Sequence, residues 1–581
     1  MKNSEAARIF SELANLLELN GENPFRVRAY RRAAMVVEGF PRDIAGMAKE
    51  ELKEIPGIGE DLASKLLEIV RTGTCRAYEA EKKRSPAGLS ILLAIPGLGP
   101  KTARAIYEKF PVRSMDELQD LAATHRLKGA VPKIKDKTEQ NIIRGIELIK
   151  KGADRKLLGR VRPIAEEMVA ALWEKPKTPV KRISICGSLR RWKETIGDID
   201  ILAASDDPER VMDVFTHLPQ VRQVISRGQT KSTVILAEGI QSDLRVVEPA
   251  SFGAALCYFT GSKEHNIRIR EMGIKKGLKI NEYGIFDKAG KKVGGAEEED
   301  VYRILGLPFI APELREDAGE IAAAHEGRLP QLVELDDIKG DLHAHTKLSD
   351  GHNTAIELAN AAMARGWSYI AVTDHSKGLG IARGLSAEKI LKEMDEIDKL
   401  NETFSFSGDF RILKGVEVDI RSDATLDLPD SVLSRLDIVN ASIHSGFRQP
   451  IEKITGRIVA AMKNPFVTTI SHPTGRLLGE REAYQVDMDA VLKVASETGT
   501  AIEINSFPAR LDLNDIMARR AKDLGVPIVI NTDAHVIEHF DYMRYGVAIA
   551  RRAWLESRDV VNTFEVNKIL EVLHRKRLVL K

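Results

Sequence analysis

From residue 338 to the C-terminus, short apolar runs alternate with helical stretches, and this alternation constrains the fold more than any other feature of the chain. Seven runs are strand-like, and they are GDLHAH, YIAVTDH, RILKGVEVDI, DIVNASIH, FVTTISH, TAIEIN and VPIVINTDAH. Alternation of this kind is typical of parallel strands, because each intervening helix returns the chain to the same end of the sheet. We therefore predict an α/β domain of parallel strands with crossover helices over 338–581.

Side chains that bind metals stand in these runs, nearly all at the predicted carboxyl ends of strands, where barrel folds carry their chemistry. They are His343, His345, Asp350, His375, Glu417, His444, His472, Asp533 and His535. Taken alone, His343 and His345 on one strand face are equally compatible with two surface histidines. The full set exceeds what one ion can use, so it predicts a cluster of two or three ions. Mixed imidazole and carboxylate ligands suit Mn²⁺ or Zn²⁺.

Length and composition set the class of protein. A chain of 581 residues is too long for one core, and roughly 150 residues per domain predicts about four units. No run of about 18 apolar residues exists to cross a bilayer, and the N-terminus MKNSEAARIFSEL has no signal or transit pattern. Cys75, Cys186 and Cys257 lack CxxC spacing, so we expect buried thiols. We predict a cytoplasmic monomer without membrane contact.

Two glycine-containing segments near the N-terminus are nearly identical: IPGIGEDLASKL at 55–66 and IPGLGPKTARAI at 95–106. Pro-Gly-x-Gly between two helices makes a tight turn and exposes the N–H groups of the second helix, which can bind phosphate. A single copy is compatible with a plain helix–helix turn, whereas two copies followed by Lys or Arg resemble helix-hairpin-helix motifs that hold the DNA backbone. The predicted DNA-binding positions are Gly57, Gly59, Gly97, Gly99 and Lys101.

The segment GSLRRWKETIGDIDIL at 187–202 is the most specific signal in the first half of the chain. Asp198 and Asp200 are two apart on a predicted strand, so both carboxylates leave the same face. Asp243 lies on another predicted strand and completes a nest of three carboxylates for two Mg²⁺ or Mn²⁺ ions. The alternative is a solvated acidic strand edge.

The order and spacing of GSLRR, GDID, YFTGSKEHN (258–266) and LKINEYGIF (278–286) resemble those of the family X DNA polymerases, over residues 1 to about 317. The resemblance implies that the three aspartates hold the metals and that Asp243 deprotonates the primer 3′-hydroxyl. It implies that Tyr258 discourages a 2′-hydroxyl and that Arg270, with Asn266, contacts the nascent pair and the template. The implied nucleotide-binding positions are Gly187, Ser188, Arg191, Gly197, Tyr258, Phe259, Gly261 and Asn266.

Lys65 falls at the position of a lysine that, in this family, removes a 5′-deoxyribose phosphate through a Schiff base. Asp61 and Arg26 stand where that chemistry uses lysines. Two interpretations of Lys65 stay open: a weak lyase or AP-endonuclease activity, and a helix-surface lysine close to DNA.

The histidine set resembles the PHP (polymerase and histidinol phosphatase) domain over 338–581, with all nine ligand positions filled. The resemblance implies a distorted seven-stranded βα barrel with a trinuclear phosphoesterase site. In a chain that also carries a family X polymerase, it implies a 3′-5′ exonuclease and related 3′-end processing.

Together these features predict a multidomain α+β and α/β protein that fills short gaps during base excision repair. Its partners are gapped or primer-template DNA and deoxynucleoside triphosphates. The rival hypothesis is a DNA-binding scaffold with an inactive polymerase half and only a PHP phosphoesterase. The predicted domains are a helical lyase-like domain (1–84), a fingers-like helical domain (85–155), a palm (156–250), a thumb (251–317), a linker (318–337) and the PHP domain (338–581).

Overall fold

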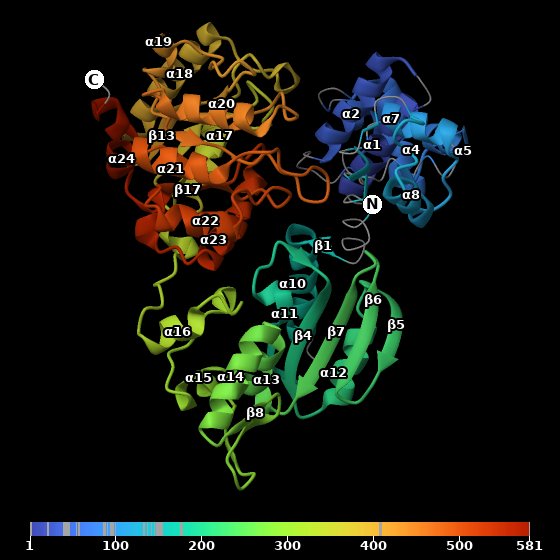
Figure 1. Ribbon diagram of the computed structural model, residues 1–581, viewed down its shortest axis with the longest axis vertical. Helices are drawn as coiled ribbons and strands as arrows, with labels where there is room; N and C mark the ends of the chain where they lie inside the picture. The colour runs from blue at the N-terminus through green and yellow to red at the C-terminus, as the bar shows by residue number, and fades with distance from the viewer. Residues whose placement is uncertain are drawn as a thin grey trace. The chain divides into compact units, whose positions relative to one another are not determined.

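The computed structural model describes residues 155–174, 178–405 and 410–579 continuously. Before residue 155 it describes residues 3–19, 22–38, 44, 47–53, 55, 58–84, 89, 91–92, 98, 100–131, 134–135, 138–140, 142–143 and 146. The chain forms two units, Met1–Ala153 and Asp154–Lys581 (Figure 1).

The regular elements described in the first unit are all helices. Its helices are α1 Asn3–Leu19, α2 Pro24–Glu38, α3 Lys49–Lys53, α4 Glu60–Thr72, α5 Arg76–Arg84, α7 Pro100–Lys109 and α8 Met115–Ala123. Apolar residues recur at helical spacing, so the helices bury one face. The buried residues form two clusters, one around Phe10 and Leu66 and one around Ile106 and Leu118. Two such cores are what two successive helix-hairpin-helix modules require.

The second unit begins with a mixed five-stranded sheet of order β2-β4-β7-β6-β5, in which only β4 and β7 are parallel neighbours. Its strands are β2 Val180–Ile185, β4 Asp198–Ser205, β5 Val221–Arg227, β6 Lys231–Leu236 and β7 Gln241–Val247. Beside it lie the short pair β1 Lys156–Leu157 and β3 Thr195–Ile196 and the helices α10 Leu158–Glu174, α11 Gly187–Arg190 and α12 Pro208–Thr216.

The alternation along β4 determines which face of this sheet carries the acidic side chains. Ile199 and Ile201 belong to the same apolar cluster as residues of α10 and α12. Leu202 and Ala204 point to the opposite face, where they pack against the helix Phe252–Thr260. Because side chains alternate with period two, Asp200 shares that second face.

A smaller subdomain follows the sheet. Its elements are η2 Pro249–Ser251, α13 Phe252–Thr260, α14 Lys263–Lys275, β8 Lys279–Asn281, β9 Gly284–Phe286, β10 Lys292–Gly294, α15 Glu299–Ile304 and η3 Pro312–Leu314. The segment 318–337, predicted as a linker, contains α16 Glu320–His325 and η4 Leu335–Asp337. This segment packs against the subdomain, since Ala324 is in its core and the buried Glu320 Oε1 lies 2.6 Å from His265 Nδ1.

The rest of the chain forms a barrel of seven parallel strands in the order of the sequence. The strands are β11 Gly340–Ala344, β12 Tyr369–Val372, β13 Arg411–Asp419, β14 Ile438–Ser442, β15 Thr469–Ile470, β16 Ala501–Asn505 and β17 Ile528–Asn531. The first and last strands meet, because the His345 N–H donates to the Ala534 carbonyl at 2.8 Å. The parallel strands predicted from the alternation are therefore confirmed.

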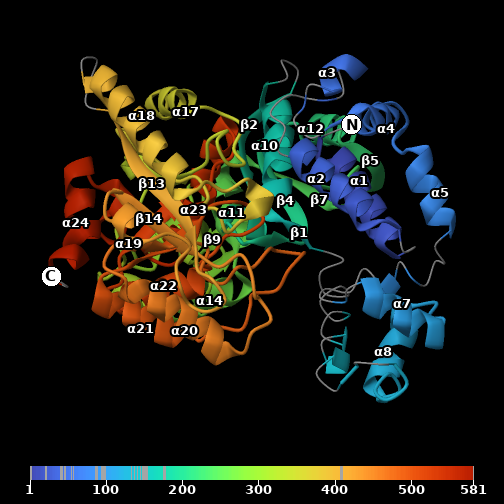
Figure 2. The same cartoon turned by 90° about the horizontal axis from the view of Figure 1, so that it is seen from above.

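Helices cover the outside of the barrel, and Figure 2 shows α20, α21 and α22 side by side there. The elements are α17 Ala355–Met363, η5 Gly380–Ala382, α18 Ala387–Ser405, α19 Asp430–Leu433, α20 Ile451–Lys463, α21 Met488–Thr498, α22 Asp515–Asp523, η6 Ile537–Tyr542, α23 Met543–Arg552, η7 Ser557–Asp559, η8 Val561–Thr563 and α24 Val566–Val579.

Two expectations from composition can be compared with the structure. Cys75, Cys186 and Cys257 are free and buried, as predicted. Among the helices that the structure describes, none has both the length and the apolar content needed to cross a membrane.

Candidate active sites

The three predicted aspartates meet at one end of the five-stranded sheet. Asp200 on β4 and Asp243 on β7 are direct partners in the parallel register, and Asp198 is the first residue of β4. All three lie on the same face of the sheet as Leu202 and Ala204. Helix α13 packs on this face at Leu202 and Ala204, further along β4 than the aspartates. The exposed Asp198 and the partly buried Asp200 therefore stand at an open end of this face.

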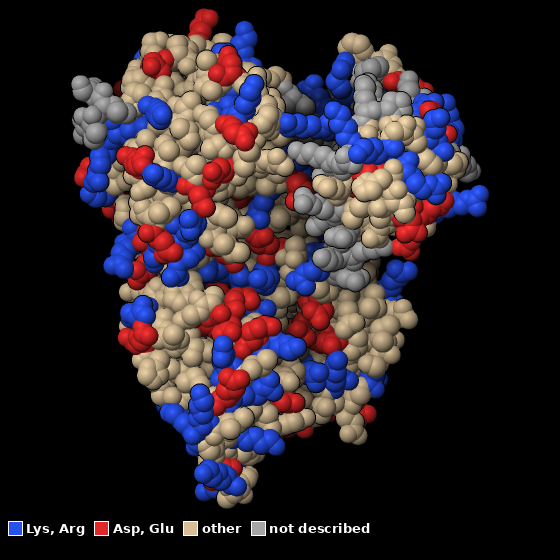
Figure 3. All heavy atoms as spheres, in the orientation of Figure 1, with Lys and Arg blue, Asp and Glu red and all other residues tan. Residues whose placement is uncertain are grey.

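The charge at this end of the sheet requires compensation. Burial raises the pKa of the Asp200 carboxyl, and the nearby Asp198 and Asp243 raise it further, to about 7. Lys231 Nζ lies 2.7 Å from Asp243 Oδ2 and neutralises part of the charge. Figure 3 shows acidic side chains grouped in the region of β4 and β7. The three carboxylates supply oxygen ligands, and Lys231 neutralises only part of their negative charge. Such a site fits a divalent cation.

The glycine turn before β4 touches the same carboxylates. Gly187 has φ +62°, and a Cβ atom at this position would lie 2.5 Å from Asp200 Oδ2. Ser188 follows it in α11. The turn therefore brings backbone N–H groups and a hydroxyl close to the aspartates, where the terminal phosphates of a nucleotide can bind.

Several of the other predicted nucleotide-binding residues are linked by hydrogen bonds and ring contacts. Arg191 donates to Glu316 Oε1 at 3.1 Å and to the Thr260 carbonyl, next to Gly261. Asn266 Nδ2 donates to the Tyr258 carbonyl at 2.7 Å. The ring centre of Phe259 is 5.1 Å from that of Tyr258, and Gly197 lies beside Arg155. Arg270, the predicted DNA contact, donates from Nε to the Asn266 carbonyl at 3.3 Å.

In the first unit, Gly59 and Lys65 are described in full. Gly59 is the N-cap of α4 and has no side chain to cap the helix, so the N–H groups of the first turn stay available to a phosphate. Lys65 is paired with Asp61, and although burial lowers the Lys65 pKa, hydrogen bonds to Asp61 and Tyr30 raise it above its ordinary value. The predicted Gly57, Gly97 and Gly99 lie outside the described residues, as does the side chain of Lys101.

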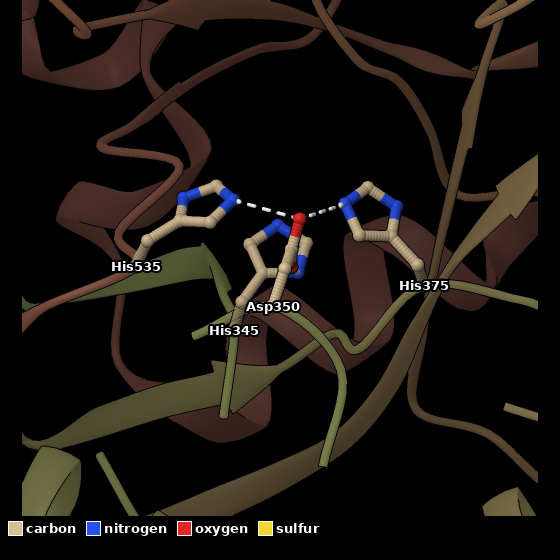
Figure 4. Close-up of side chains that lie close together, drawn as sticks. All are labelled: His345, Asp350, His375 and His535. Atoms are coloured by element: carbon tan, nitrogen blue, oxygen red, sulfur yellow. Dashed lines mark ion pairs between the residues drawn. The ribbon is translucent and has the colours of Figure 1, made fainter. Parts of the chain in front are cut away.

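The structure brings together all nine side chains predicted at the barrel rim. Eight of them form three overlapping groups in which one ligand atom from each residue lies within 4.8 Å of the others. The groups are His345, Asp350, His375 and His535 (Figure 4); His343, His345, Glu417 and Asp533; and His375, Glu417 and His444. Asp350 Oδ2 in the first group is 3.5 Å from Nε2 of both His375 and His535. The overlap suits several ions that share ligands.

Glu417 is the centre of this cluster. Its Oε2 lies 3.2 Å from His343 Nε2 and 3.0 Å from His375 Nδ1. Its Oε1 lies 3.3 Å from His444 Nε2 and 2.9 Å from His472 Nε2. Burial alone would raise the Glu417 pKa, but the surrounding histidines hold it well below its usual range. An ionised carboxylate with both oxygens directed at imidazoles can bridge two cations.

Three imidazole nitrogens give a direct test of whether the cluster fits metals. His343 Nε2, His345 Nδ1 and His375 Nδ1 are buried. Although carboxylate oxygens of Glu417 or Asp350 lie 3.0–3.8 Å away, none of the three nitrogens makes a well-aligned hydrogen bond among the described residues. Buried polar atoms normally have a partner, and a metal ion is the partner that imidazole nitrogens among carboxylates accept. The nine side chains therefore fit divalent metal ions.

Two residues that were not predicted from the sequence, Glu503 and Asp419, support these ligands. Glu503 Oε1 lies 2.7 Å from His343 Nδ1, and Asp419 Oδ1 accepts from the backbone N–H of His444 at 3.2 Å and lies 3.5 Å from its Nδ1. The signal for Glu503 was present, because an acidic residue inside the apolar run TAIEIN is unusual in a buried strand. A carboxylate that accepts from one ring nitrogen orients the other toward a metal.

Comparison with known proteins agrees with these two sites. Residues 255–316 match the DNA polymerase beta thumb, 1–75 a helix-hairpin-helix domain, 89–147 a SAM-like helix-hairpin-helix tandem and 341–507 the PHP domain. DNA polymerase lambda of Rattus norvegicus is 26% identical over 335 residues, which are 52% of this chain and 54% of that protein. A probable phosphatase of Thermoanaerobacter sp. (strain X514) is 37% identical over 251 residues, which are 41% of this chain and 95% of that protein.

One relative matches from end to end. The DNA polymerase/3′-5′ exonuclease PolX of Bacillus subtilis (strain 168) is 38% identical over 578 residues, which cover 99% of this chain and 100% of that protein. The match includes both the sheet with the three aspartates and the barrel with the nine rim ligands. The chain therefore belongs to the PolX family, in which a family X DNA polymerase and a PHP domain form one polypeptide.

Proposed function

We propose that this protein fills short gaps in DNA during base excision repair and that its PHP domain removes nucleotides from DNA 3′ ends. One observation carries the proposal: a single unit contains both sites. In its five-stranded sheet, Asp200 and Asp243 are paired on neighbouring strands beside the Gly187 turn. In its barrel, all nine predicted rim ligands lie together. A polymerase and a nuclease in one chain fit insertion followed by correction of the same 3′ end.

In the polymerase site, Asp198, Asp200 and Asp243 would hold two Mg²⁺ or Mn²⁺ ions. Such ions, when bound, stabilise the charge on the attacking and leaving oxygens of phosphoryl transfer. Asp243 would accept the proton of the primer 3′-hydroxyl. The Gly187 turn with Ser188 and Arg191 would hold the triphosphate, and Tyr258 would exclude a ribose 2′-hydroxyl.

In the barrel, the nine rim residues would hold two or three Mn²⁺ or Zn²⁺ ions. When bound, such ions would activate a water molecule for attack on a phosphodiester and would stabilise the charge on the leaving oxygen. Glu503 holds a proton on His343 Nδ1, so His343 Nε2 keeps its lone pair free for a ligand bond.

The first unit would hold the substrate, which is gapped or primer-template DNA, through its helix-hairpin-helix modules, with deoxynucleoside triphosphates as the second substrate. The five domains and the linker, with boundaries at 84, 155, 250, 317 and 337, belong to this proposal. The paired, protonated Lys65 supports a role near DNA better than a Schiff-base lyase. The monomeric state and the cytoplasmic location stay predictions.

Extension of a primer across a one-nucleotide gap, measured with nuclease activity on the same 3′ end, tests the proposal. We expect both activities in the presence of Mg²⁺ and Mn²⁺ and neither in EDTA. Nuclease activity without any incorporation would favour the rival hypothesis, a DNA-binding scaffold that carries only a PHP phosphoesterase.

A further inference from the structure

The connection from α11 to β4, residues 191–197, includes the short strand β3 and links the predicted triphosphate site to the barrel domain. Its ends carry the nucleotide-binding positions Arg191 and Gly197, and its middle carries Trp192 and Glu194. Side chains from the barrel domain contact three of these residues. We call these residues 191–197 the triphosphate loop.

Arg476 of the barrel domain forms a bidentate ion pair with Glu194. Its Nη1 lies 3.2 Å from Glu194 Oε2 and its Nη2 lies 2.5 Å from Glu194 Oε1. The Arg476 Nε donates to the Arg510 carbonyl at 2.9 Å. Both side chains are largely buried, and burial raises the Glu194 pKa while Arg476 opposes that rise. Two parallel charge-assisted bonds fix both the distance and the orientation of the loop.

Arg552, on α23, contacts the other end of the triphosphate loop. Its Nη1 donates to the Arg191 carbonyl at 2.8 Å and to Glu316 Oε1 at 3.0 Å. The same Glu316 oxygen accepts from Arg191 Nε at 3.1 Å. Asp515 holds the Arg552 guanidinium on its far side at 2.6 Å. The backbone and the side chain of Arg191 are therefore both tied to one nearly buried arginine of the barrel domain.

Trp192 completes the contact between the loop and the barrel. Its backbone has φ +55°, which is uncommon for a residue other than glycine. The Arg162 guanidinium lies 3.3 Å from the centre of its ring, and the Tyr545 ring packs edge-on at 6.0 Å. Contacts on both sides hold the Trp192 side chain in place. These contacts stabilise the otherwise unfavourable left-handed backbone conformation of Trp192.

We propose that Arg476 and Arg552 of the PHP domain are positioning residues of the polymerase reaction, which set the triphosphate loop at the distance from Asp198 and Asp200 that a bound nucleotide requires. Neither arginine touches the nucleotide in this role, because each acts through Glu194 or Arg191. A loop released from one of these ties loses the geometry that orients Arg191, and small displacements of positioning groups cost large factors in rate or affinity. The inference rests on the proposed gap-filling activity.

The test compares gap filling by Arg476→Gln, Arg552→Gln and Arg551→Gln in the full chain. Arg551 is the matched control, since it lies beside Arg552 on α23 and pairs with Glu313 at 2.8 Å and with Glu334, but not with the triphosphate loop. We expect KM for the deoxynucleotide to rise about fivefold or more in the first two variants with kcat within about twofold, and neither value to change in Arg551→Gln. Arg476→Lys, which keeps the charge but not the bidentate geometry, should give an intermediate KM.

A double-mutant cycle separates positioning from general loss of structure. If Arg476 acts through Glu194, then Arg476→Gln in a Glu194→Gln background raises KM no further. Hydrolysis of bis(4-nitrophenyl) phosphate by the Arg552→Gln variant reports that the barrel is folded.

Three outcomes would overturn the inference. KM could stay unchanged in both Arg476→Gln and Arg552→Gln, KM could rise equally in Arg551→Gln, or the effects of Arg476→Gln and Glu194→Gln on KM could be additive. Failure of the wild type to extend the primer is a different result, because it removes the proposed function itself.

Discussion

Glu503 Oε1 lies 2.7 Å from His343 Nδ1, and both side chains are completely buried inside the barrel. Asn531 Nδ2 donates to the same Glu503 oxygen at 2.9 Å, so the carboxylate is fixed from two directions. Burial alone would lower the His343 pKa, but Glu503, Asp533 and Glu417 together raise it well above its ordinary value. Glu503 therefore orients the His343 ring through Nδ1 and directs Nε2 toward Glu417 and the rest of the cluster.

Glu503→Gln should weaken metal binding at the barrel without removing a ligand. Loss of a carboxylate behind a ligating histidine costs about 10–100-fold in metal affinity, so the Mn²⁺ concentration for half-maximal nuclease activity should rise by that factor. A metal titration of the nuclease measures it, with the exposed Glu538→Gln as the control. An unchanged Mn²⁺ dependence would show that Glu503 does not orient His343.

His343→Ala should remove 3′-5′ degradation and leave gap filling intact, because His343 belongs to the barrel cluster and the polymerase carboxylates lie on another sheet. We expect nuclease activity to fall by more than about 100-fold, or about 2.7 kcal/mol of barrier. Extension and degradation are measured on one gapped substrate, and circular dichroism confirms folding. Undiminished degradation would place the nuclease elsewhere.

Asp198→Ala should abolish incorporation, because Asp198 would share the metals with Asp200 and Asp243. DNA affinity should stay within about twofold of the wild type, since the hairpin modules hold the DNA backbone. Asp206→Ala is the control, because Asp206 is an exposed aspartate just beyond the end of β4. Incorporation within about tenfold of the wild type would contradict the metal role.

Asp200→Asn should stabilise the folded protein at neutral and alkaline pH when metals are removed by EDTA. The folded pKa of Asp200 is about 7, above the unfolded value of about 3.9, so the ionised carboxyl destabilises the fold. That cost is absent below pH 4, grows between pH 4 and 7 and is complete above pH 7. We expect the variant to be more stable by about 1–3 kcal/mol at pH 8. Thermal unfolding at several pH values measures this difference, and a pH-independent difference would contradict it.

Tyr258→Ala should relax the discrimination between deoxyribose and ribose. The Tyr258 backbone is held by Asn266 and its ring by Phe259, so the ring has a fixed place from which to exclude a 2′-hydroxyl. We expect the ratio of ribonucleotide to deoxynucleotide incorporation to rise by about tenfold or more. Tyr283→Ala, at an exposed position between β8 and β9, is the control. If the ratio stays constant in Tyr258→Ala, another group excludes the ribose.

Periodicity in the sequence was enough to determine the shared face of predicted ligands that lie on one strand. Asp198 and Asp200 are two residues apart on a strand, and side chains alternate with period two, so their shared face followed without knowledge of the fold. The alternating strands and helices after residue 338 likewise required parallel pairing, which brings the strand ends with His444, His472 and Asp533 to one rim. Rules of this kind operate over a few residues, so their consequences can be predicted from the sequence alone.

How groups that are distant in the sequence combine depends on the tertiary structure. Glu417 lies among four histidines, and Glu503 contacts His343, because of the register and curvature of the barrel. The ion pair Arg476–Glu194, which spans 282 residues of sequence, depends on how the barrel packs against the five-stranded sheet. Packing of this kind results from the sum of many weak contacts that no local pattern encodes. The sequence predicts a linker over 318–337, whereas in the fold this segment packs against the subdomain of α13, α14 and α15. These packing contacts are also not encoded by a local pattern.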